Sequence, residues 1–536
     1  MEADVVIYGA TPGGLAAAVQ VERMGHRAIV LEPTERIGGL TTGGLGCTDI
    51  GSKGAYGGIA REFYRDVKRH YAKDVNWKWQ KRDEYVYTGC EGGYPKDAAE
   101  MWLFEPSAAL AILERWERKE KLTVARKAVL DRRVGGVSKA DGRITEIRLL
   151  DGRVFRGRVF IDATYEGDLL AAAGVSYAVG REDNAVYGET LNGAQPDVSC
   201  GYHRLEEGVD PYVEKGNCAS GLLPGIDPEP MGAVGQGDRR VQAYCYRMCL
   251  TDVPENRRPF EKPNGYDERD YELLFRNYEC GALAHGLPWI NSKMPNRKTD
   301  TNNCKGFSTD CIGQNWNYPE ASYEERERIR AAHLRYQQGL LWTLANHPRI
   351  PEKVRQEVSR WGVCKDEFVE TAGWQRQLYV REARRMIGEY VMTEAECRGR
   401  KVAPRPVALA SFQMDSHHVR RYVNANGFVQ NEGDVEAHLV PHPYGVDYGA
   451  IVPRRGECAN LIVPVCVSAS HIAFGSIRME PMFFALGQAA GTAAVLAADG
   501  NCAVQDVDYA TLRARLLADG QKIERTQVDD ASQKEN

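Results

Sequence analysis

The sequence lacks the features that would assign it to a membrane or to nucleic acid. No window approaches 18 uninterrupted apolar residues, so we expect no membrane span. Lys and Arg (69) nearly balance Asp and Glu (74), and a net charge of −5 favours neither nucleic acid nor an anionic membrane as a partner. The first predicted strand begins by about residue 4, which leaves no room for a signal peptide.

The spacing of the cysteines does not indicate a disulfide framework or a metal site. The 14 cysteines form no C-x-x-C pair, and no His/Cys spacing is typical of zinc, so no metal is predicted. Reduced, buried thiols are therefore expected, and they favour a cytoplasmic location. A periplasmic protein whose leader has been removed would have the same sequence, so that alternative stays open.

A chain of 536 residues is too long for one ordinary core. Its amino-acid composition changes at about 181 and again at about 400, because the residues between these points are rich in aromatic residues, Asn and Pro. The predicted fold is α/β, with a Rossmann-like domain formed by residues 1–180 and 401–515 and an inserted α+β substrate or cap domain at 181–400. Residues 516–536 are predicted to be a flexible tail.

Two segments of the middle part have helical periodicity, at 323–346 and 375–396. In the second, Arg381 would lie on one side of the helix with Arg384 and Arg385. That arrangement is more typical of a salt-bridged face than of a carboxylate clamp.

The N-terminal stretch 5–32 predicts a strand, a Gly-rich turn, a helix and a second strand that ends on an acid. Gly9 would open a turn too tight for a side chain, and Gly13 and Gly14 would let the helix start close to the strand. The free N–H groups of that helix would face a pyrophosphate. Glu32 falls where a carboxylate accepts hydrogen bonds from an adenosine ribose, and its charge disfavours NADP.

Thr11 departs from the usual pattern, because it stands at the second glycine of G-x-G-x-x-G. The flanking strands and the terminal acid therefore carry the assignment to a dinucleotide site. Only one such unit is visible, since GAVGQG (232–237) has neither a strand before it nor a helix after it. A flavin held by one unit needs no second domain for a nicotinamide, which favours FAD over NAD.

Three pieces of sequence together carry a family resemblance. They are the Gly9–Glu32 unit with the glycine run at 37–51, the segment VFIDATYEGDLL at 159–170, and the segment at 460–494. Together they resemble FAD-dependent oxidoreductases of the two-dinucleotide-binding-domain type. The chain is most similar, over nearly its whole length, to a bacterial family called simply FAD-dependent oxidoreductase. Its members are mostly uncharacterised, and some carry labels such as xanthan lyase.

The resemblance implies a glutathione-reductase-type fold around FAD. It also implies which residues contact the cofactor: Gly9, Thr11, Gly14, Glu32, Gly39 and Thr42, with Ala163, Thr164 and Asp168 near its adenosine and pyrophosphate side.

The last predicted helix offers a contact with the flavin. Glu480-Pro481 is typical of a helix start, where the missing N–H of proline is harmless. If this end points at the flavin, its dipole and free N–H groups would stabilise the reduced anion. We therefore expect residues 476–482, including Ser476 and Pro481, to bind the cofactor.

Oxidation of an alcohol by hydride transfer needs a base, and histidine is the commonest one near neutral pH. His471 lies between the closing strand and helix, beside Arg478, which could hold a flavin or substrate oxygen. His417 and His418 lie where the chain returns from the inserted domain to the cofactor domain. These residues are the predicted catalytic group.

The predicted function is hydride transfer from a small polar substrate, such as a carbohydrate-like alcohol, to flavin N5. The acceptor that reoxidises the flavin is unknown, and oxygen, a quinone or a protein carrier would each serve. One alternative is a reductase of an activated alkene, similar to fumarate reductases. Another is a carbohydrate lyase in which FAD has no redox role. Substrate, acceptor and oligomeric state do not follow from the sequence.

Overall fold

A mainly parallel sheet forms the base of the molecule. The computed structural model describes residues 1–86, 98–196, 198, 203–282 and 289–528. The strand order in the sheet is β3-β2-β1-β6-β5-β4, and β20 pairs with the second half of β6. Segments that lie almost 300 residues apart in the chain thus meet in one sheet. Its strands are β1 (Glu2–Tyr8), β2 (Ala28–Glu32), β3 (Thr123–Arg126), β4 (Val137–Ala140), β5 (Arg143–Arg148), β6 (Val154–Asp162) and β20 (Leu461–Ile462).

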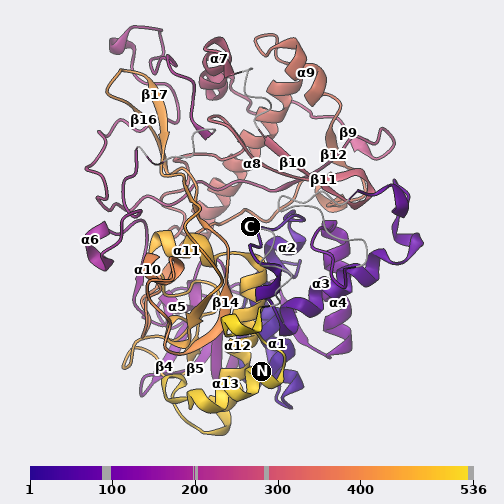
Figure 1. Cartoon of the computed structure of the whole chain (residues 1–536), viewed down its shortest axis with the longest axis vertical. Helices are drawn as coiled ribbons and strands as arrows, with labels where there is room; N and C mark the ends of the chain where they lie inside the picture. The colour runs from indigo at the N-terminus through magenta and orange to yellow at the C-terminus, as the bar shows by residue number, and fades with distance from the viewer. Residues whose placement is uncertain (87–97, 197, 199–202, 283–288, 529–536) are drawn as a thin grey trace.

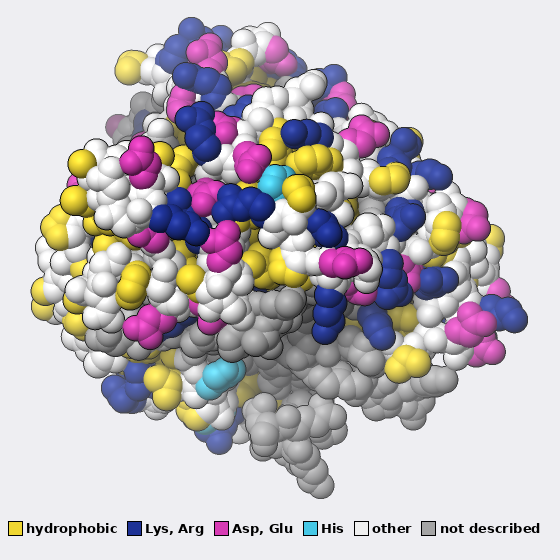
Figure 2. Space-filling model, turned by 90° about the horizontal axis from the view of Figure 1, so that it is seen from above, with side chains coloured by type: hydrophobic (Ala, Val, Ile, Leu, Met, Phe, Trp, Pro, Cys, Tyr) yellow, Lys and Arg dark blue, Asp and Glu magenta, His cyan; other side chains and the backbone are white. Residues whose placement is uncertain are grey.

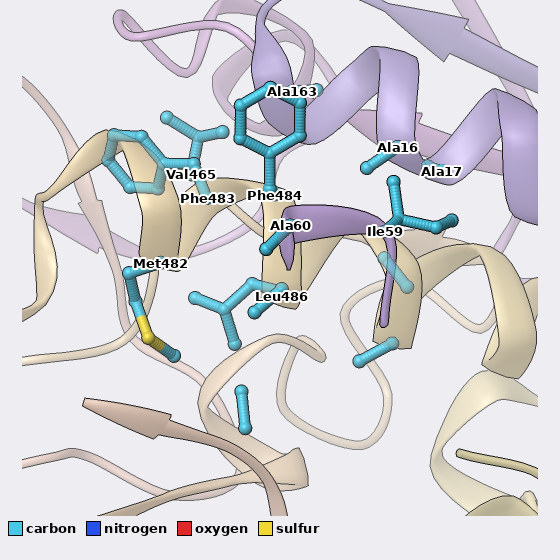
Figure 3. Packing of buried hydrophobic residues seen from close by; sticks show 14 of the residues in the cluster. Ala16, Ala17, Ile59, Ala60, Ala163, Val465, Met482, Phe483, Phe484 and Leu486 are labelled. Atoms are coloured by element: carbon cyan, nitrogen blue, oxygen red, sulfur yellow. The ribbon is translucent and has the colours of Figure 1, made fainter. Parts of the chain in front are cut away.

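Helices α1 and α12 pack unusually closely beside this sheet. A Cβ on Gly487 would lie 2.1 Å from the carbonyl oxygen of Gly13, and a Cβ on Gly491 would lie 2.6 Å from that of Ala17. Figure 3 shows the surrounding core, in which Phe484 lies among small and branched side chains. We call this part, with its sheet, the cofactor domain. Its helices are α1 (Pro12–Arg23), α2 (Gly39–Thr42), α3 (Gly58–Tyr71), α4 (Pro106–Lys119), α5 (Asp168–Ala172), α10 (Glu394–Cys397), α11 (His471–Ile477), α12 (Glu480–Asp499) and α13 (Tyr509–Ala518).

The start of α12 at Glu480 agrees with the sequence prediction. Among the described residues, α12 is the helix that is long and apolar enough to cross a membrane, with 94% of its most apolar window buried inside the protein. It is a core helix of the cofactor domain.

A second, antiparallel sheet lies above the cofactor domain in Figure 1 and, with its helices, forms what we call the cap. Its strand order is β10-β11-β8-β12-β9. The predicted helix at 323–346 is present as α8 (Tyr323–Asn346). The other elements of the cap are β8 (Met248–Thr251), β9 (Arg257–Arg258), α7 (Glu272–Glu279), β10 (Trp289–Met294), β11 (Lys298–Asn303), α9 (Glu352–Val358) and β12 (Gly362–Cys364), whereas α6 (Asn184–Tyr187) is level with α10 in Figure 1. Seen from above, its described surface carries side chains of both charges interspersed (Figure 2).

A long hairpin at 406–447 connects the two parts (Figure 1). Its base is buried in the core of the cofactor domain through Val446, and its tip is buried in the cap core through Val429. The prediction had assigned the whole of 401–515 to the cofactor domain, whereas this tip belongs to the cap. The paired strands are β14 (Pro406–Ala410) with β19 (Tyr444–Asp447), β15 (Met414–Ser416) with β18 (Val435–Ala437), and β16 (Arg420–Val423) with β17 (Val429–Glu432).

The predicted helix at 375–396 is wrong. The segment is mostly extended, with β13 (Arg385–Met386) pairing with β7 (Tyr177–Ala178), and only the short α10 begins near its end. Arg381, Arg384 and Arg385 are not on a solvated face either, since each is at most 5% exposed. Each pairs with a different carboxylate from another part of the chain, and these tertiary ion pairs override the local helical preference.

Residues 516–528, predicted as part of a flexible tail, pack against the cofactor domain. The Gln521 amide donates to the carbonyl oxygens of Val407 and Ala485, and Ile523 is 1% exposed. Residues 529–536 lie outside the described part of the chain. The other boundaries of the predicted domains, near 180 and 400, stay predictions.

Candidate active site at the junction of two domains

The glycine turn after β1 leaves no room for side chains. Gly9 has φ +100°, and a Cβ on it would lie 2.9 Å from the carbonyl of Ala163. A Cβ on Gly14 would lie 1.9 Å from the carbonyl oxygen of Gly9. Thr11 has a role of its own, because its hydroxyl caps α1 by accepting from the Gly14 N–H (3.3 Å) and donates to the Ala163 oxygen (2.7 Å). Thr11, which stands where the pattern has a glycine, thus connects the start of α1 to the residue after β6.

Glu32 ends β2 beside this turn. Its carboxylate accepts from the backbone N–H of Ala10 (2.9 Å) and from the N–H and hydroxyl of Thr34 (2.8 and 2.7 Å). Burial raises the pKa of Glu32, and these hydrogen bonds oppose the rise. The acid therefore lies where the sequence placed it, at the carboxyl edge of the sheet next to the glycine turn.

The second glycine run folds back over the first. The Gly38 N–H donates to the carbonyl oxygen of Ala10 (2.7 Å), which joins the two turns. Gly39 has φ +48°, and a Cβ there would lie 2.5 Å from the hydroxyl of Tyr165. Thr42 donates to the carbonyl oxygen of Ile37 (2.6 Å), so its hydroxyl closes the turn.

Glu480 connects α12 to this run. Its carboxyl accepts from the hydroxyls of Thr41 and Tyr165, both at 2.8 Å, while the Tyr165 oxygen accepts from the Leu40 N–H (3.0 Å). Burial raises the pKa of Glu480 to about 7. Pro481 occupies the first turn of α12, as predicted. The start of α12 therefore touches α2, beside the glycine cradle formed by residues 9–14 and 38–42.

Three predicted cofactor residues have other partners. The Asp168 carboxylate is bound by Arg132, Arg326 and Arg384 at 2.7–3.1 Å, and these arginines lower its pKa against the effect of burial. The Ser476 hydroxyl donates to the Phe412 carbonyl oxygen and accepts from Tyr444. The Thr164 hydroxyl donates a hydrogen bond to the Asp162 carboxylate (2.7 Å). A contact of any of these side chains with the cofactor stays a prediction.

A ring of buried polar side chains lies at the junction of the cofactor domain, the cap and the hairpin. Tyr379 accepts a hydrogen bond from Arg478 (2.8 Å), and Arg478 also donates to Asp415 (2.9 Å). The backbone of Tyr379 pairs with Cys245, and its ring packs with Leu40 and Leu45 beside α2. One side of the ring therefore borders the glycine cradle.

His417 closes the ring. Its Nδ1 lies 2.7 Å from Asp310, whose other oxygen pairs with Arg381 (2.9 Å), and the Arg381 guanidinium lies 4.6 Å from the centre of the Tyr379 ring. Nε2 of His417 lies 3.9 Å from Asp415, too far for a direct hydrogen bond. We call Tyr379, Arg478, Asp415, His417, Asp310 and Arg381 the interface ring.

The charges around His417 leave its Nε2 atom able to accept a proton. Burial would raise the pKa of Asp310, but Arg381 and His417 outweigh it, so the pKa is lowered and the carboxylate is ionised. Burial and Arg381 lower the pKa of His417, so its imidazole is neutral at neutral pH. An ionised Asp310 therefore accepts from Nδ1–H, which leaves the Nε2 lone pair as the proton acceptor.

His471 and His418 lie beside the ring rather than in it. His471 contacts both oxygens of Glu382 (2.8 and 3.0 Å), and Glu382 accepts from the backbone N–H of Gln242. The Gln242 side chain accepts from the backbone N–H of His417 (2.9 Å), so Glu382 and Gln242 together link the two histidines. His418 lies 3.6 Å from Asp434, and burial lowers its pKa to about 4.

His203 and Asp434 were not among the predicted site residues. Nδ1 of His203 lies 2.5 Å from Asp434, and His203 also has a hydrogen bond to the Cys304 thiol. Burial lowers the pKa of His203, but Asp434 and Cys304 outweigh it and raise it to about 10. The imidazolium–carboxylate pair lies next to His418, with ring centres 6.1 Å apart. Contacts between residues more than 200 positions apart leave no local pattern to read.

Comparison with known proteins decides the family. Residues 4–516 match the family model described as FAD dependent oxidoreductase. The chain belongs to this family. It is an FAD-dependent oxidoreductase, and its cofactor is FAD. No curated protein matches the chain.

Solved flavoenzymes show weaker likeness, over part of their length. A flavin-containing monooxygenase from Stenotrophomonas maltophilia is 20% identical over 34% of this chain and 43% of its own, with a TM-score of 0.19. 3-Ketosteroid-delta4-(5alpha)-dehydrogenase from Rhodococcus jostii RHA1 is 17% identical over 32% and 48%, with a TM-score of 0.20. L-Amino acid deaminase from Proteus vulgaris is 14% identical over 34% and 53%, with a TM-score of 0.23. The chain thus spans about half or less of these proteins.

The cradle fits FAD. Gly9 and Gly14 bring the start of α1 against β6 without side chains, which is the approach that a pyrophosphate needs. The Glu32 carboxylate lies beside this turn, where a ribose contact stays a prediction, and the starts of α2 and α12 meet at Glu480. The Nε atom of Arg478 is buried and has no hydrogen-bond partner among the described residues, so a donor remains for an acceptor-rich group.

Proposed function

We propose that this FAD-dependent oxidoreductase oxidises a small, hydroxyl-rich substrate, such as a carbohydrate-like alcohol, at the interface ring. FAD would supply a two-electron acceptor for the hydride of the substrate. The protein's part is to hold the alcohol, to exclude water and to take the hydroxyl proton at Nε2 of His417.

Unsatisfied neutral side chains around the ring carry this proposal. Thr48, Thr309, Gln242 and Gln375 are each at most 6% exposed, and each has a side-chain atom without a hydrogen-bond partner in the described part of the chain. Such groups are rare in native proteins, because each costs about 1–3 kcal/mol when nothing binds it. Hydroxyls and amides offer donors and acceptors together, which suits a substrate rich in hydroxyl groups.

These side chains lie beside the ring and the cradle. Thr309 precedes Asp310, and Gln242 binds the backbone of His417. The Gln375 amide nitrogen lies 3.0 Å from the place of a Cβ on Gly44, within the second glycine run. Thr48 follows Cys47, whose N–H donates to Asp300 (2.9 Å).

The charge balance of the ring favours a neutral substrate. Arg478 pairs with Asp415 and Arg381 with Asp310, and next to them Arg247 pairs with Asp300 at 2.8 Å. Each guanidinium thus has its own carboxylate. An alkene reductase that binds unsaturated acids would instead need cations free to hold the substrate carboxylate.

Anaerobic titration tests the proposal. Purified protein with bound FAD is mixed with sugars, polyols, amines or organic acids while the flavin absorbance is followed. We expect bleaching by a polyol or sugar. Oxidation of chemically reduced enzyme by unsaturated acids alone would instead identify an alkene reductase. Substrate cleavage without any bleaching would identify a lyase.

A further inference from the structure

Two cysteines face each other across neighbouring strands of the cap sheet. The antiparallel register pairs Gly362 with Thr251 and Val363 with Leu250, so the next residue, Cys364, falls opposite Cys249. Their sulfur atoms lie 3.8 Å apart. Both side chains are buried, at 1% exposure or less.

The backbone at this place suits a disulfide. Residues directly opposite in an antiparallel pair have Cα atoms about 4.5–5.5 Å apart, inside the range of about 4.4–6.8 Å found for disulfides. The sulfurs must approach from 3.8 Å to about 2 Å, which a change of side-chain torsion achieves without moving the strands.

The pair belongs to the cap face that covers the cofactor domain. Asp300 is the register partner of Cys249 on β11, and Asp300 accepts from the Cys47 N–H of the second glycine run. Met294 and Phe368 pack around the two sulfurs. The strand next to the dithiol therefore carries a contact between the cap and the second glycine run.

The surroundings keep the reduced Cys249 thiol protonated. Burial raises the pKa of the Cys249 thiol, and Cys364 and Glu367 add to the rise. The Lys298 ammonium opposes it, but Lys298 is itself bound by Glu105, Asp366 and Glu367 at 2.7–3.0 Å. A buried, protonated thiol reacts slowly, so a small oxidant is needed.

We propose that Cys249 and Cys364 form a reversible disulfide when hydrogen peroxide oxidises the protein. One sulfur attacks the peroxide, becomes a sulfenic acid and releases water. The second sulfur attacks the sulfenic sulfur, the S–S bond forms, and a second water leaves. In sum, two thiols lose two electrons and two protons, and one peroxide is reduced to two waters. The proposal does not depend on the identity of the substrate.

Peptide mapping of the full-length protein with its FAD tests this. The protein is treated with hydrogen peroxide, unfolded in an alkylating reagent and digested without reductant. We expect a cross-linked peptide that joins Cys249 to Cys364, with a loss of two hydrogens, and its disappearance after dithiothreitol. The oxidised protein should unfold at a Tm about 4 °C higher, since the bond closes a loop of more than 100 residues.

Variants test whether Cys249 and Cys364 are the two cysteines that form the disulfide. Cys249→Ser or Cys364→Ser should abolish the cross-link, whereas Cys397→Ser, which removes a buried thiol elsewhere, should leave it intact. The mapping of the wild-type chain decides the matter even if a variant fails to fold. Alkylation of both Cys249 and Cys364 after peroxide treatment would overturn the proposal, as would a cross-link from either one to another cysteine.

Discussion

The glycine cradle is built from closely packed backbone and short loops. The interface ring is built from long side chains of distant segments that form hydrogen bonds and ion pairs with one another. A methyl group in the cradle meets backbone at 1.9–2.9 Å, as at Gly14 and Gly9. In the ring, Arg381, Asp310 and His417 come from three separate stretches of chain. Gly9 and Gly14 therefore tolerate no side chain, while the ring tolerates no lost charge.

That contrast predicts that substitutions in the two regions have different effects. A clash with backbone in the cradle expels the cofactor or shifts a helix. A missing carboxylate in the ring leaves a cation buried without a partner but leaves the cradle in place. Variants in the two regions should therefore separate loss of FAD from loss of chemistry.

Gly14→Ala should have the largest effect. Its Cβ would lie 1.9 Å from the Gly9 oxygen, so α1 must move away from β1. We expect FAD affinity to fall about a thousandfold, measured by flavin retention on gel filtration and by fluorescence titration. Gly13→Ala is the matched control, because its Cβ meets a Val465 methyl at 3.1 Å and should cost much less. Equal FAD binding by Gly14→Ala and the wild type would contradict the account.

Asp168→Asn should lower stability without changing FAD binding. The loss of the charge leaves Arg326 buried without its carboxylate and removes one carboxylate partner each from Arg384 and the partly exposed Arg132. We expect about 3–5 kcal/mol less stability in urea unfolding. An FAD affinity changed by more than about tenfold, with stability unaltered, would instead place Asp168 at the cofactor.

Glu480→Gln should change how stability depends on pH. The pKa of Glu480 rises from 4.5 to about 7 on folding, so the folded state keeps a proton that the unfolded chain loses. Wild-type stability should therefore fall relative to the variant as pH rises from 4.5 to 7, by about 3 kcal/mol. Urea unfolding of both proteins across this range measures it, and parallel curves would refute the assignment.

His417→Gln should slow reduction of the bound flavin while FAD is retained. Glutamine cannot take the hydroxyl proton, and loss of a general base costs about 100-fold or more. Anaerobic stopped-flow with the substrate found by titration gives the rate. A wild-type rate in this variant would remove His417 from the role of base.

His471→Gln should have the smallest effect. His471 is bound through Nδ1 to Glu382, and Gln242 links Glu382 to the ring. We expect a slowing of about tenfold or less, from displacement rather than lost proton transfer. A slowing equal to that of His417→Gln, with the pH profile of a lost base, would show that His471 takes the proton.

The cradle could be predicted from sequence because its causes are local. Gly9, Gly14 and Glu32 stand at fixed spacing within one strand–helix–strand unit, and the same residues build the turn. The start of α12 was equally readable, since proline at the first helical turn is a local signal. The hydroxyl role of Thr11 was not, because its second partner, Ala163, lies 152 residues away.

The ring could be predicted only in part. His417 and Arg478 were candidates by position, but Asp310, Asp415 and Tyr379 were not, since nothing in their own stretches marks them. The stretch around Arg381 even indicated a helix. Its extended conformation is stabilised by carboxylates from elsewhere in the chain, which a local window does not contain.

The account rests on the interface ring being the place where substrate meets the cofactor. A crystal structure of the protein with FAD and a slowly reacting polyol tests this most directly. We predict polyol density within hydrogen-bonding distance of Nε2 of His417 and the hydroxyl of Tyr379. Density for the polyol elsewhere, with His417 and Tyr379 untouched, would contradict the account.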